Sequence, residues 1–420
     1  MAYSGFITTL KDVRKHTNAD RLQVATVFGN DVVVSLDYKV GDVVIYFPTD
    51  GQLGVEYVKE NKLSREDGGY LDPKKRNVTT IKLRGEKSDG LLMKVDSLKK
   101  FTKVEDLKDG DKIDILNGVV ICEKYIPFKP QNKQMPNQKE KVKKENIYPL
   151  FAQHIDTPQL AYDLGKFKVG DDCIVTLKMH GTSQRTAYTV KDGKKGLAHK
   201  LIKFLFGTNG LPKKWEVATG TRRVNLQGFD GGFYGDNAFR KQWHDLFDGK
   251  LEKGETVYYE VVGYTDSGAL IMPECDNKKL KDKEFVKQYG DTTKFTYGCN
   301  YGQSDIYVYR MTMTNEDGFV VEYPWDLVKL RCEQMGVKFT PELERFKFTT
   351  KEDLLERVNR HTDGVDPIGK THLREGSIVR IEGREKFTAL KHKSFDFKVL
   401  EGIIKTDASQ PDMEEAESTF

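Results

Sequence analysis

The sequence predicts an α+β protein, with an all-β domain followed by a domain of antiparallel sheets with packed helices. Three observations favour this class. The length of 420 residues suits more than one domain. Short β-branched runs separated by glycine and proline turns fill the first part of the chain. In the rest, strand patterns outnumber helix patterns and the turns are short, which favours antiparallel over doubly wound parallel sheets.

The composition indicates a soluble globular protein, with 38% hydrophobic and 31% charged residues and a mean hydropathy of −0.60. No apolar run approaches the roughly 20 residues needed to cross a bilayer, so we expect no membrane partner. The start, "MAYSGFITTLKDVRK", lacks the features of a signal peptide. The five cysteines form no C-x-x-C pair, which predicts a reducing compartment without structural zinc: the cytoplasm, or the host cytoplasm for a viral protein.

Residues 1–123 are predicted to form the all-β domain. The stretch "LQVATVFGNDVVVSLDYKVGDVVIYFP" has turns at Gly29-Asn30 and Gly41-Asp42, and a second strand pair is expected to turn at Ser88-Asp89-Gly90. So many short strands suit a small barrel of the OB type or a sandwich. Composition alone allows a domain that serves only as a scaffold. The barrel is favoured because "HTNADRL" and "YKVGDVVIYFPTDGQL" resemble OB-fold RNA-binding modules.

Residues 124–146 are rich in lysine and proline and are predicted to be a basic linker, either a solvated tether or a strap near phosphates. Residues 406–420 are predicted to be an acidic, disordered tail, so the net charge of +4 understates how basic the rest of the chain is. Between them lies the second domain, residues 147–405. Its expected strands and helices follow: strands at 173–179, 184–190, 255–264, 305–313, 375–383 and 387–393, and helices at 237–249, 324–336 and 351–361.

Charged residues stand at or beside several of these strands. Lys178 ends one strand, Glu260 lies in the middle of another, and Glu375 precedes a third. Lys391 and Lys393 are two apart and therefore project from the same face of their strand. Each charge alone is typical of a solvated or salt-bridged residue. Together they would equip one cleft to bind a nucleoside triphosphate with a divalent metal and to transfer part of it.

Two further groups of residues accompany this set. His180 and Gly181 follow Lys178 directly, and the glycine would let a ligand approach the backbone closely. Arg222 and Arg223 are adjacent in a strand-like segment, so at most one of them is expected to point into a common cleft.

A lysine is nucleophilic only when it is neutral. Nearby cations, a bound metal and burial would each favour the neutral amine.

Six motifs occur in the order and spacing of the collinear motifs of covalent lysyl-nucleotidyltransferases: "KMHGTS", "TGTRR", "YYEVVG", "DIYVYR", "REGSIVR" and "LKHKS". This superfamily contains ATP-dependent polynucleotide ligases and mRNA capping enzymes. K-x-H-G-T resembles the RNA ligase branch, and the first domain resembles the OB module that precedes the catalytic domain in RNA ligase family five. DNA ligases and capping enzymes carry an OB domain after the last lysine motif, and residues 394–420 are too few for one.

The resemblance implies a role for each matching residue. Lys178 would attack the α-phosphorus of ATP and become lysyl-AMP, while Lys391 and Lys393 would neutralise the phosphate. Glu375 would bind Mg²⁺ or Mn²⁺, the hard cations that carboxylates suit. Glu260 would contact the ribose or help to hold the metal.

Further residues would bind ATP or AMP. Arg222 would contact the ribose or the terminal phosphate, and Gly181 would lie against the nucleotide. Tyr309 stands where the family places the aromatic ring that stacks on adenine, although a core role would also explain it. His180 would either hold its loop or assist adenylate transfer.

The resemblance therefore implies a monomeric ATP-dependent RNA ligase. It would join 3′-OH and 5′-phosphate ends of RNA, in a nicked duplex, at broken ends or in an RNA/DNA hybrid, through lysyl-AMP and a 5′-adenylated strand. Two alternatives remain open. One is a capping-type guanylyltransferase or a DNA ligase, and the other is a non-catalytic RNA-binding protein.

Overall fold

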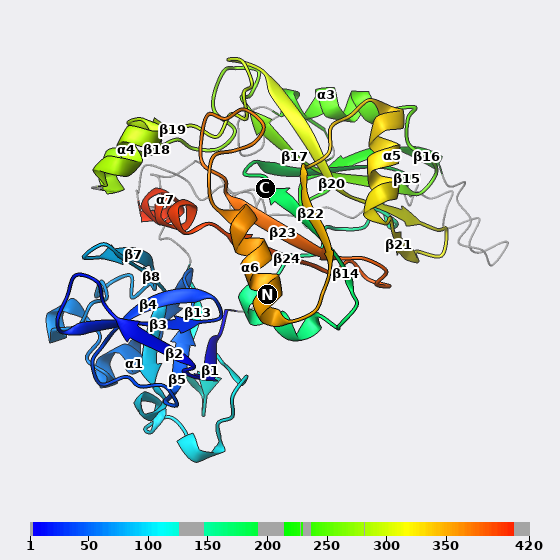
Figure 1. Cartoon of the computed structure of the whole chain (residues 1–420). Helices are drawn as coiled ribbons and strands as arrows, with labels where there is room; N and C mark the ends of the chain where they lie inside the picture. Colours follow the sequence, from blue (N-terminus) through cyan, green and yellow to red (C-terminus); the bar gives the residue numbers. More distant parts are fainter. Residues whose placement is uncertain are drawn as a thin grey trace, which may run out of the picture. The chain divides into compact units, whose positions relative to one another are not determined.

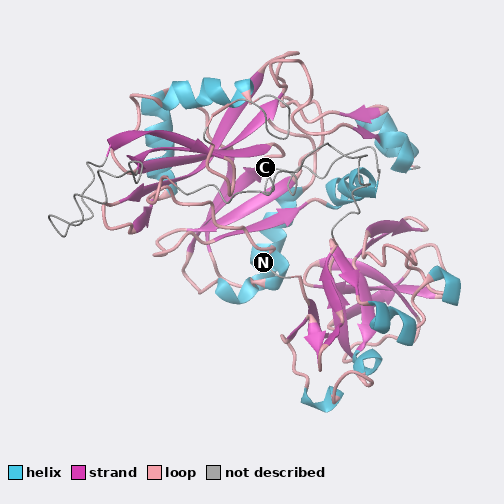
Figure 2. Cartoon of the chain, turned by 180° about the vertical axis from the view of Figure 1, so that it is seen from behind, coloured by secondary structure: helices cyan, strands magenta, loops and turns pink. Residues whose placement is uncertain are grey.

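A computed structural model describes residues 3–125, 147–191, 214–226, 228–229, 237–280 and 282–406 (Figure 1). The chain divides into two compact units, one of residues Met1–Pro130 with Phe395–Ala408, and one of residues Gln131–Ser394 with Ser409–Phe420. Strands make up most of the regular structure of each unit (Figure 2). The predicted linker, apart from Lys124 and Tyr125, and the predicted tail beyond Thr406 lie outside the described residues.

The first unit is built from short antiparallel strands. A four-stranded sheet has the order β10-β1-β5-β9, a three-stranded sheet has the order β2-β3-β4, and three two-stranded ladders pair β6 with β13, β7 with β8, and β11 with β12. The bounds are β1 (Gly5–Thr9), β2 (Asp12–Lys15), β3 (Leu22–Val27), β4 (Asn30–Ser35), β5 (Val43–Phe47), β6 (Gly51–Leu53), β7 (Thr80–Leu83), β8 (Glu86–Asp89), β9 (Leu91–Lys94), β10 (Lys112–Ile113), β11 (Ile115–Leu116), β12 (Val119–Val120) and β13 (Cys122–Lys124). One short helix, α1 (Val55–Glu60), joins them.

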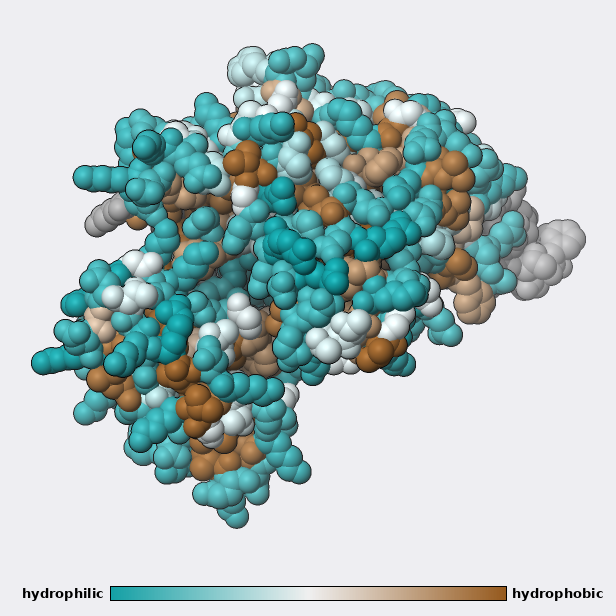
Figure 3. All heavy atoms as spheres, in the orientation of Figure 1, coloured by the Kyte–Doolittle hydropathy of each residue, from teal (hydrophilic) through white to brown (hydrophobic). Residues whose placement is uncertain are grey.

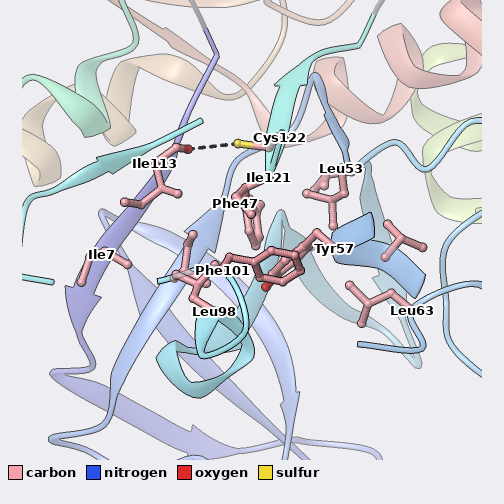
Figure 4. Packing of buried hydrophobic residues seen from close by; sticks show 13 residues of the cluster. Ile7, Phe47, Leu53, Tyr57, Leu63, Leu98, Phe101, Ile113, Ile121 and Cys122 are labelled. Atoms are coloured by element: carbon pink, nitrogen blue, oxygen red, sulfur yellow. Dashed lines mark hydrogen bonds between the residues drawn. The ribbon is translucent and has the colours of Figure 1, made fainter. Parts of the chain in front are cut away.

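The core of this unit gathers side chains from β1, β5, β6, β10, β13 and α1 and from the segments between them (Figure 4). Ile7, Phe47 and Tyr57 are fully buried, and the Tyr57 ring lies 5.5 Å from that of Phe47. The Cys122 thiol donates to the carbonyl of Ile113 at 3.1 Å, which joins β13 to β10. Burying a large apolar side chain contributes about 1.5–3 kcal/mol, so this cluster stabilises the unit.

The hairpin of β7 and β8 differs from the expected one. The chain turns at Arg84-Gly85, whose φ angles of +49° and +94° suit a two-residue hairpin turn. Ser88 and Asp89, expected in the turn, are buried residues of β8. Their polar atoms are used inside the unit: Thr80 Oγ1 donates to Asp89 at 2.7 Å. The sequence "RGEKSDG" contains two glycines, and each could form the turn. The turn forms at the first glycine, because Ser88 and Asp89 are buried in β8.

Helix α7 (Phe395–Thr406) groups with the first unit, whereas we expected the second domain to reach residue 405. Lys398 forms an ion pair with Asp89, and the ammonium of Lys87 lies 4.8 Å from the centre of the Phe395 ring. Leu400 is fully buried. The amphipathic pattern of residues 395–406 shows a helix but does not show which unit covers its apolar face.

The second unit contains two antiparallel sheets. The first has the strand order β16-β15-β17-β20-β21 and the second β22-β14-β23-β24. The bounds are β14 (Asp172–Lys178), β15 (Thr182–Lys191), β16 (Lys214–Gly220), β17 (Glu255–Gly263), β20 (Ser304–Thr314), β21 (Val320–Glu322), β22 (Glu342–Lys347), β23 (Gly376–Ile381) and β24 (Ala389–Lys393). All six predicted strands are present, with ends shifted by a few residues.

Three helices pack on these sheets (Figure 1): α3 (Ala238–Phe247) on β15 and β16, α5 (Trp325–Met335) on β20, and α6 (Lys351–Thr362) on β14, β23 and β24. All three were predicted. Helix α5 follows Pro324 and ends at Gly336, whose φ of +68° is the left-handed conformation that favours glycine.

An excursion of about 40 residues separates β17 from its hairpin partner β20, and the sequence did not predict its structure. It contains β18 (Cys275–Asp276), a 3₁₀ turn, α4 (Lys283–Tyr289) and β19 (Thr292–Thr293).

On the face of the molecule in Figure 3, hydrophilic side chains cover most of the surface. No helix among the described residues is long and apolar enough to cross a membrane.

Candidate active site

Three neighbouring strands bring Lys178, Glu375 and Lys393 together. Strand β23 pairs with β14 on one side and β24 on the other, with Gly376 opposite both Lys178 and Lys393. Lys178 Nζ lies 2.7 Å from Glu375 Oε1, and Lys393 Nζ lies 3.7 Å from the same oxygen. The Glu375 side chain is 1% exposed. A buried carboxylate shared by two ammonium groups satisfies the requirement that buried charges be paired.

Gly376 allows this close arrangement. Its φ is +153°, and a Cβ at this position would lie 2.1 Å from the carbonyl oxygen of His392. The backbone of β24 therefore approaches β23 more closely than any side chain would permit. As a result, Glu375 and Lys393 lie within ion-pairing distance.

The side chain of His392 and those of Lys391 and Lys393 lie on opposite faces of strand β24. His392 Nε2 lies 2.8 Å from Oδ1 of Asn359 on α6, so His392 faces that helix. Lys391 and Lys393 project from the opposite face, as the alternation predicts. The backbone N–H of Lys391 donates to the carbonyl of Pro158 at 2.8 Å, which fixes the strand at this position. Lys393 is buried and Lys391 half-buried.

The loop after Lys178 is held from two directions. His180 Nδ1 lies 3.7 Å from Glu375 Oε2, and the His180 backbone N–H donates to the Tyr297 hydroxyl at 2.7 Å. A Cβ at Gly181 would lie 2.5 Å from the Val261 carbonyl oxygen. We expected Gly181 to lie against a nucleotide, but its close neighbour is the backbone of β17. The glycine is needed for strand packing.

Glu260 and Tyr309 lie on the other sheet, near Ser183. Glu260 is opposite Ser183 in the β15–β17 ladder. In the β17–β20 ladder the register shifts at Tyr309, so this residue is the extra one in a β-bulge. The Tyr309 hydroxyl lies 3.0 Å from Ser183 Oγ. Burial, and then the charge of Glu260, raise the pKa of Tyr309, so its hydroxyl stays neutral.

Arg222 lies just after strand β16, near the carboxylate of Asp156. Strand β16 ends at Gly220, so Arg222 and Arg223 follow the strand and do not alternate across it. Both guanidinium groups reach one carboxylate, that of Asp156, at 4.0 Å and 3.1 Å. Strand alternation therefore does not apply to these two arginines, and the expectation that at most one of them points into a common cleft stays a prediction. Arg222 also acts on Tyr309, whose pKa its charge lowers slightly against the larger effect of burial.

Sequence reasoning missed two buried residues that hold these elements. Arg240 of α3 is 1% exposed and donates to Thr182 Oγ1 at 2.7 Å and to Gln184 Oε1 at 3.2 Å. Tyr297 comes from the excursion between β17 and β20. An arginine on a short amphipathic helix and a tyrosine in a loop carry no motif, so only the tertiary structure reveals them.

The carboxylates suit a hard divalent cation. Glu375 and Glu260 supply oxygen ligands of the kind that Mg²⁺ and Mn²⁺ prefer. Over the part of the chain that the structure describes, no three His, Cys, Asp or Glu side chains come together as a ready-made metal cluster. Mg²⁺ is commonly bound by one or two carboxylates together with substrate phosphates.

The fold comprises a first unit of short antiparallel strands and a second unit of two antiparallel sheets with packed helices. A family model described as an OB-fold domain matches residues 5–95. Solved structures of Naegleria gruberi RNA ligase share the fold of the chain. A mutant with ATP and Mn is 14% identical, with a TM-score of 0.58 over 94% of this chain and 98% of that one.

Two further structures of the N. gruberi protein give similar values. A mutant with AMP and Mn is 15% identical, with a TM-score of 0.59 over 94% of this chain and 97% of that one. The structure with PPi is 15% identical, with a TM-score of 0.57 and the same coverage. The comparison with curated protein sequences found no significant match. At such identities the likeness shows the fold.

Proposed function

We propose that this protein is an ATP-dependent RNA ligase that joins 3′-OH and 5′-phosphate ends through lysyl-AMP and a 5′-adenylated strand. The observation that carries the proposal is the position of Lys178, 2.7 Å from the buried carboxylate of Glu375 and beside Lys393. This cluster lies in a fold shared with RNA ligase structures that contain ATP and Mn, AMP and Mn, or PPi.

In the first step, Lys178 Nζ attacks the α-phosphorus of ATP. The N–P bond forms, the bond to pyrophosphate breaks, and the amine gives up its proton. Lys393 is a second cation in the same small space and would offset the negative charge of the phosphate. Lys391, on the same face of β24, adds to this positive charge. A bound Mg²⁺ or Mn²⁺, held by Glu375 and Glu260, would supply further positive charge for the phosphates.

In the next steps, AMP passes to the 5′-phosphate of a strand, and a 3′-hydroxyl then displaces AMP. Glu260 and Tyr309, which lie together beside Ser183, would contact the ribose and the adenine. Arg222 would contact the ribose or the terminal phosphate. The OB-fold unit would bind the RNA, or an RNA/DNA hybrid, mainly through phosphates. We propose that the protein acts as a monomer in the cytoplasm of a cell or host.

The test is covalent labelling with α-labelled ATP and Mg²⁺ or Mn²⁺. We expect a protein–AMP adduct that Lys178→Ala abolishes. Lys347→Ala is the matched control, because Lys347 is an exposed lysine that pairs with Asp172 on the same sheet. Normal labelling of Lys178→Ala would overturn the assignment. Preference for GTP would indicate a guanylyltransferase, and RNA binding without any adduct would indicate a non-catalytic protein.

A second assay defines the substrate. Nicked duplexes in which the 3′-OH strand, the 5′-phosphate strand and the template are each RNA or DNA would be offered to the labelled enzyme. We expect sealing to require RNA in at least one of the two joined strands. Sealing of an all-DNA nick at the same rate would indicate a DNA ligase.

A further inference from the structure

We propose that Tyr297 is a positioning residue for the adenylation of Lys178, acting through the backbone N–H of His180. The inference rests on the proposed ligase function and adds a residue outside the six motifs. Tyr297 lies in the excursion between β17 and β20, more than 110 positions from Lys178 in the sequence.

The first observation is a buried hydrogen bond. The His180 N–H donates to the Tyr297 hydroxyl at 2.7 Å, and Tyr297 is 4% exposed. Removing the hydroxyl would take this hydrogen bond from a buried N–H, which is unfavourable. The bond therefore fixes the backbone two residues after Lys178, at the point where β14 ends.

The second observation is a set of four aromatic rings around this bond. His180 lies edge-on to Phe295 with centroids 4.5 Å apart, and Phe295 lies 5.1 Å from His372. His372 in turn lies edge-on to Tyr297 at 4.5 Å. We call these four residues the aromatic clamp. Edge-to-face ring pairs stabilise a contact beyond the effect of burial alone.

The aromatic clamp reaches both partners of the ion pair. His180 follows Lys178 by two residues, and His372 precedes Glu375 by three. Phe295 and Tyr297 lie between these two histidines. A shift of the clamp would therefore move the Lys178 ammonium relative to the Glu375 carboxylate. Misplacement of a reacting group by about 1 Å can reduce a rate by about 100-fold.

The third observation is the backbone of Tyr297 itself. Its φ is +52°, a left-handed conformation that is uncommon for residues other than glycine. The next residue, Gly298, is packed so tightly that a Cβ on Gly369 would lie 2.4 Å from its backbone nitrogen. A left-handed backbone at a residue other than glycine is strained, and it persists where the surroundings hold it in place. Tight packing thus places the Tyr297 hydroxyl at one position.

The experiment compares Tyr297→Phe with Tyr259→Phe. Tyr259 lies in β17, is fully buried, and bonds Thr186 Oγ1 through its hydroxyl at 2.9 Å, so both variants lose one buried hydroxyl contact. The Tyr259 ring packs on Phe247 of α3, away from the aromatic clamp. We expect Tyr297→Phe to lower the rate constant of lysine adenylation by about 10–100-fold. The KM for ATP should change less than about threefold, and Tyr259→Phe should keep the wild-type rate.

Two readouts distinguish positioning from general damage. A strand that is already 5′-adenylated bypasses the first step, so Tyr297→Phe should seal it within about threefold of the wild-type rate. Amide hydrogen exchange at His180 should be faster in Tyr297→Phe than in Tyr259→Phe. Equal loss in both steps, or adenylation at the wild-type rate, would overturn the role of Tyr297. A wild-type protein that never acquires AMP would instead overturn the proposed ligase function, and this inference with it.

Discussion

Lys178 and Lys393 lie on opposite sides of Gly376, in two strands that both pair with β23, and both ammonium groups approach Oε1 of Glu375. Residues more than 200 positions apart in the sequence thus share one carboxylate oxygen. Two predictions test this arrangement, and two test buried charged or titratable groups elsewhere in the two units.

Gly376→Ala should disrupt the ladder between β23 and β24. The new methyl group would lie 2.1 Å from the His392 carbonyl oxygen, at a φ of +153° that L residues rarely adopt. We expect a loss of about 2–4 kcal/mol in the free energy of unfolding, together with loss of AMP labelling. Urea unfolding measures the change in the free energy of unfolding. Gly165→Ala, where a Cβ meets nothing within 4 Å, should stay within about 0.5 kcal/mol.

Glu375→Gln should remove the charge that holds Lys178 and Lys393 together while keeping the shape of the side chain. Two ammonium groups would then face each other without a carboxylate, and the metal that we propose would lose one of its two carboxylate ligands. We expect AMP labelling to fall by at least about 100-fold in rapid-quench measurements. Glu344→Gln on β22, whose carboxylate contacts Arg357 and His361, is the control. Equal rates for the two variants would contradict the assignment of Glu375.

Acid should destabilise the second unit through His154. Burial, followed by the charges of Arg310, Arg222 and Arg185, holds the pKa of His154 well below its usual value of about 6.5. Below that value the unfolded chain binds a proton that the folded chain does not, so stability falls as the pH drops. The slope is at most about 1.4 kcal/mol per pH unit for this histidine.

His154→Gln should therefore show a smaller loss of stability between pH 7.5 and pH 5.5 than the wild type. Burial also lowers the pKa of His244 and His372, so part of the pH dependence should remain. Urea unfolding at the two pH values measures the difference. An unchanged slope in the variant would show that His154 does not titrate in this way.

Lys398→Ala should destabilise the first unit. Lys398 of α7 pairs with Asp89, and the side chains are only 15% and 6% exposed. Leaving a buried carboxylate without its cation typically costs about 3–5 kcal/mol, and the hydrogen bond from Thr80 should reduce this to about 2 kcal/mol. Lys100→Ala removes an exposed pair with Glu60 and should cost less than about 1 kcal/mol. Calorimetry measures the loss of stability in each of the two variants.

The sequence predicted the strands that carry Lys178, Glu260 and Lys393, and the strand that follows Glu375. The alternating and β-branched patterns of these strands are local signals. It could not predict that Gly181 faces the Val261 carbonyl, since close strand packing and ligand approach both require glycine.

Other features depend on contacts between distant segments. Tyr297 is such a case, because a loop tyrosine shows its role only through the amide it meets. The turn at Arg84-Gly85 depends on burial of Asp89, and Asp89 in turn pairs with a helix from the other end of the chain. Periodicity does not reveal partners of this kind.

Helix α7 gives the first unit two non-contiguous pieces of chain, with Ser394 alone between Lys393 and Phe395. A gene fragment that begins at residue 147 would therefore carry an apolar helix without the rest of the first unit, and one that stops at residue 130 would lack the helix. Dissection of this protein by truncation should yield aggregation-prone pieces. A fragment of residues 1–130 mixed with a peptide of residues 395–408 should instead reassemble, as a complementation pair whose affinity reports how strongly α7 is held.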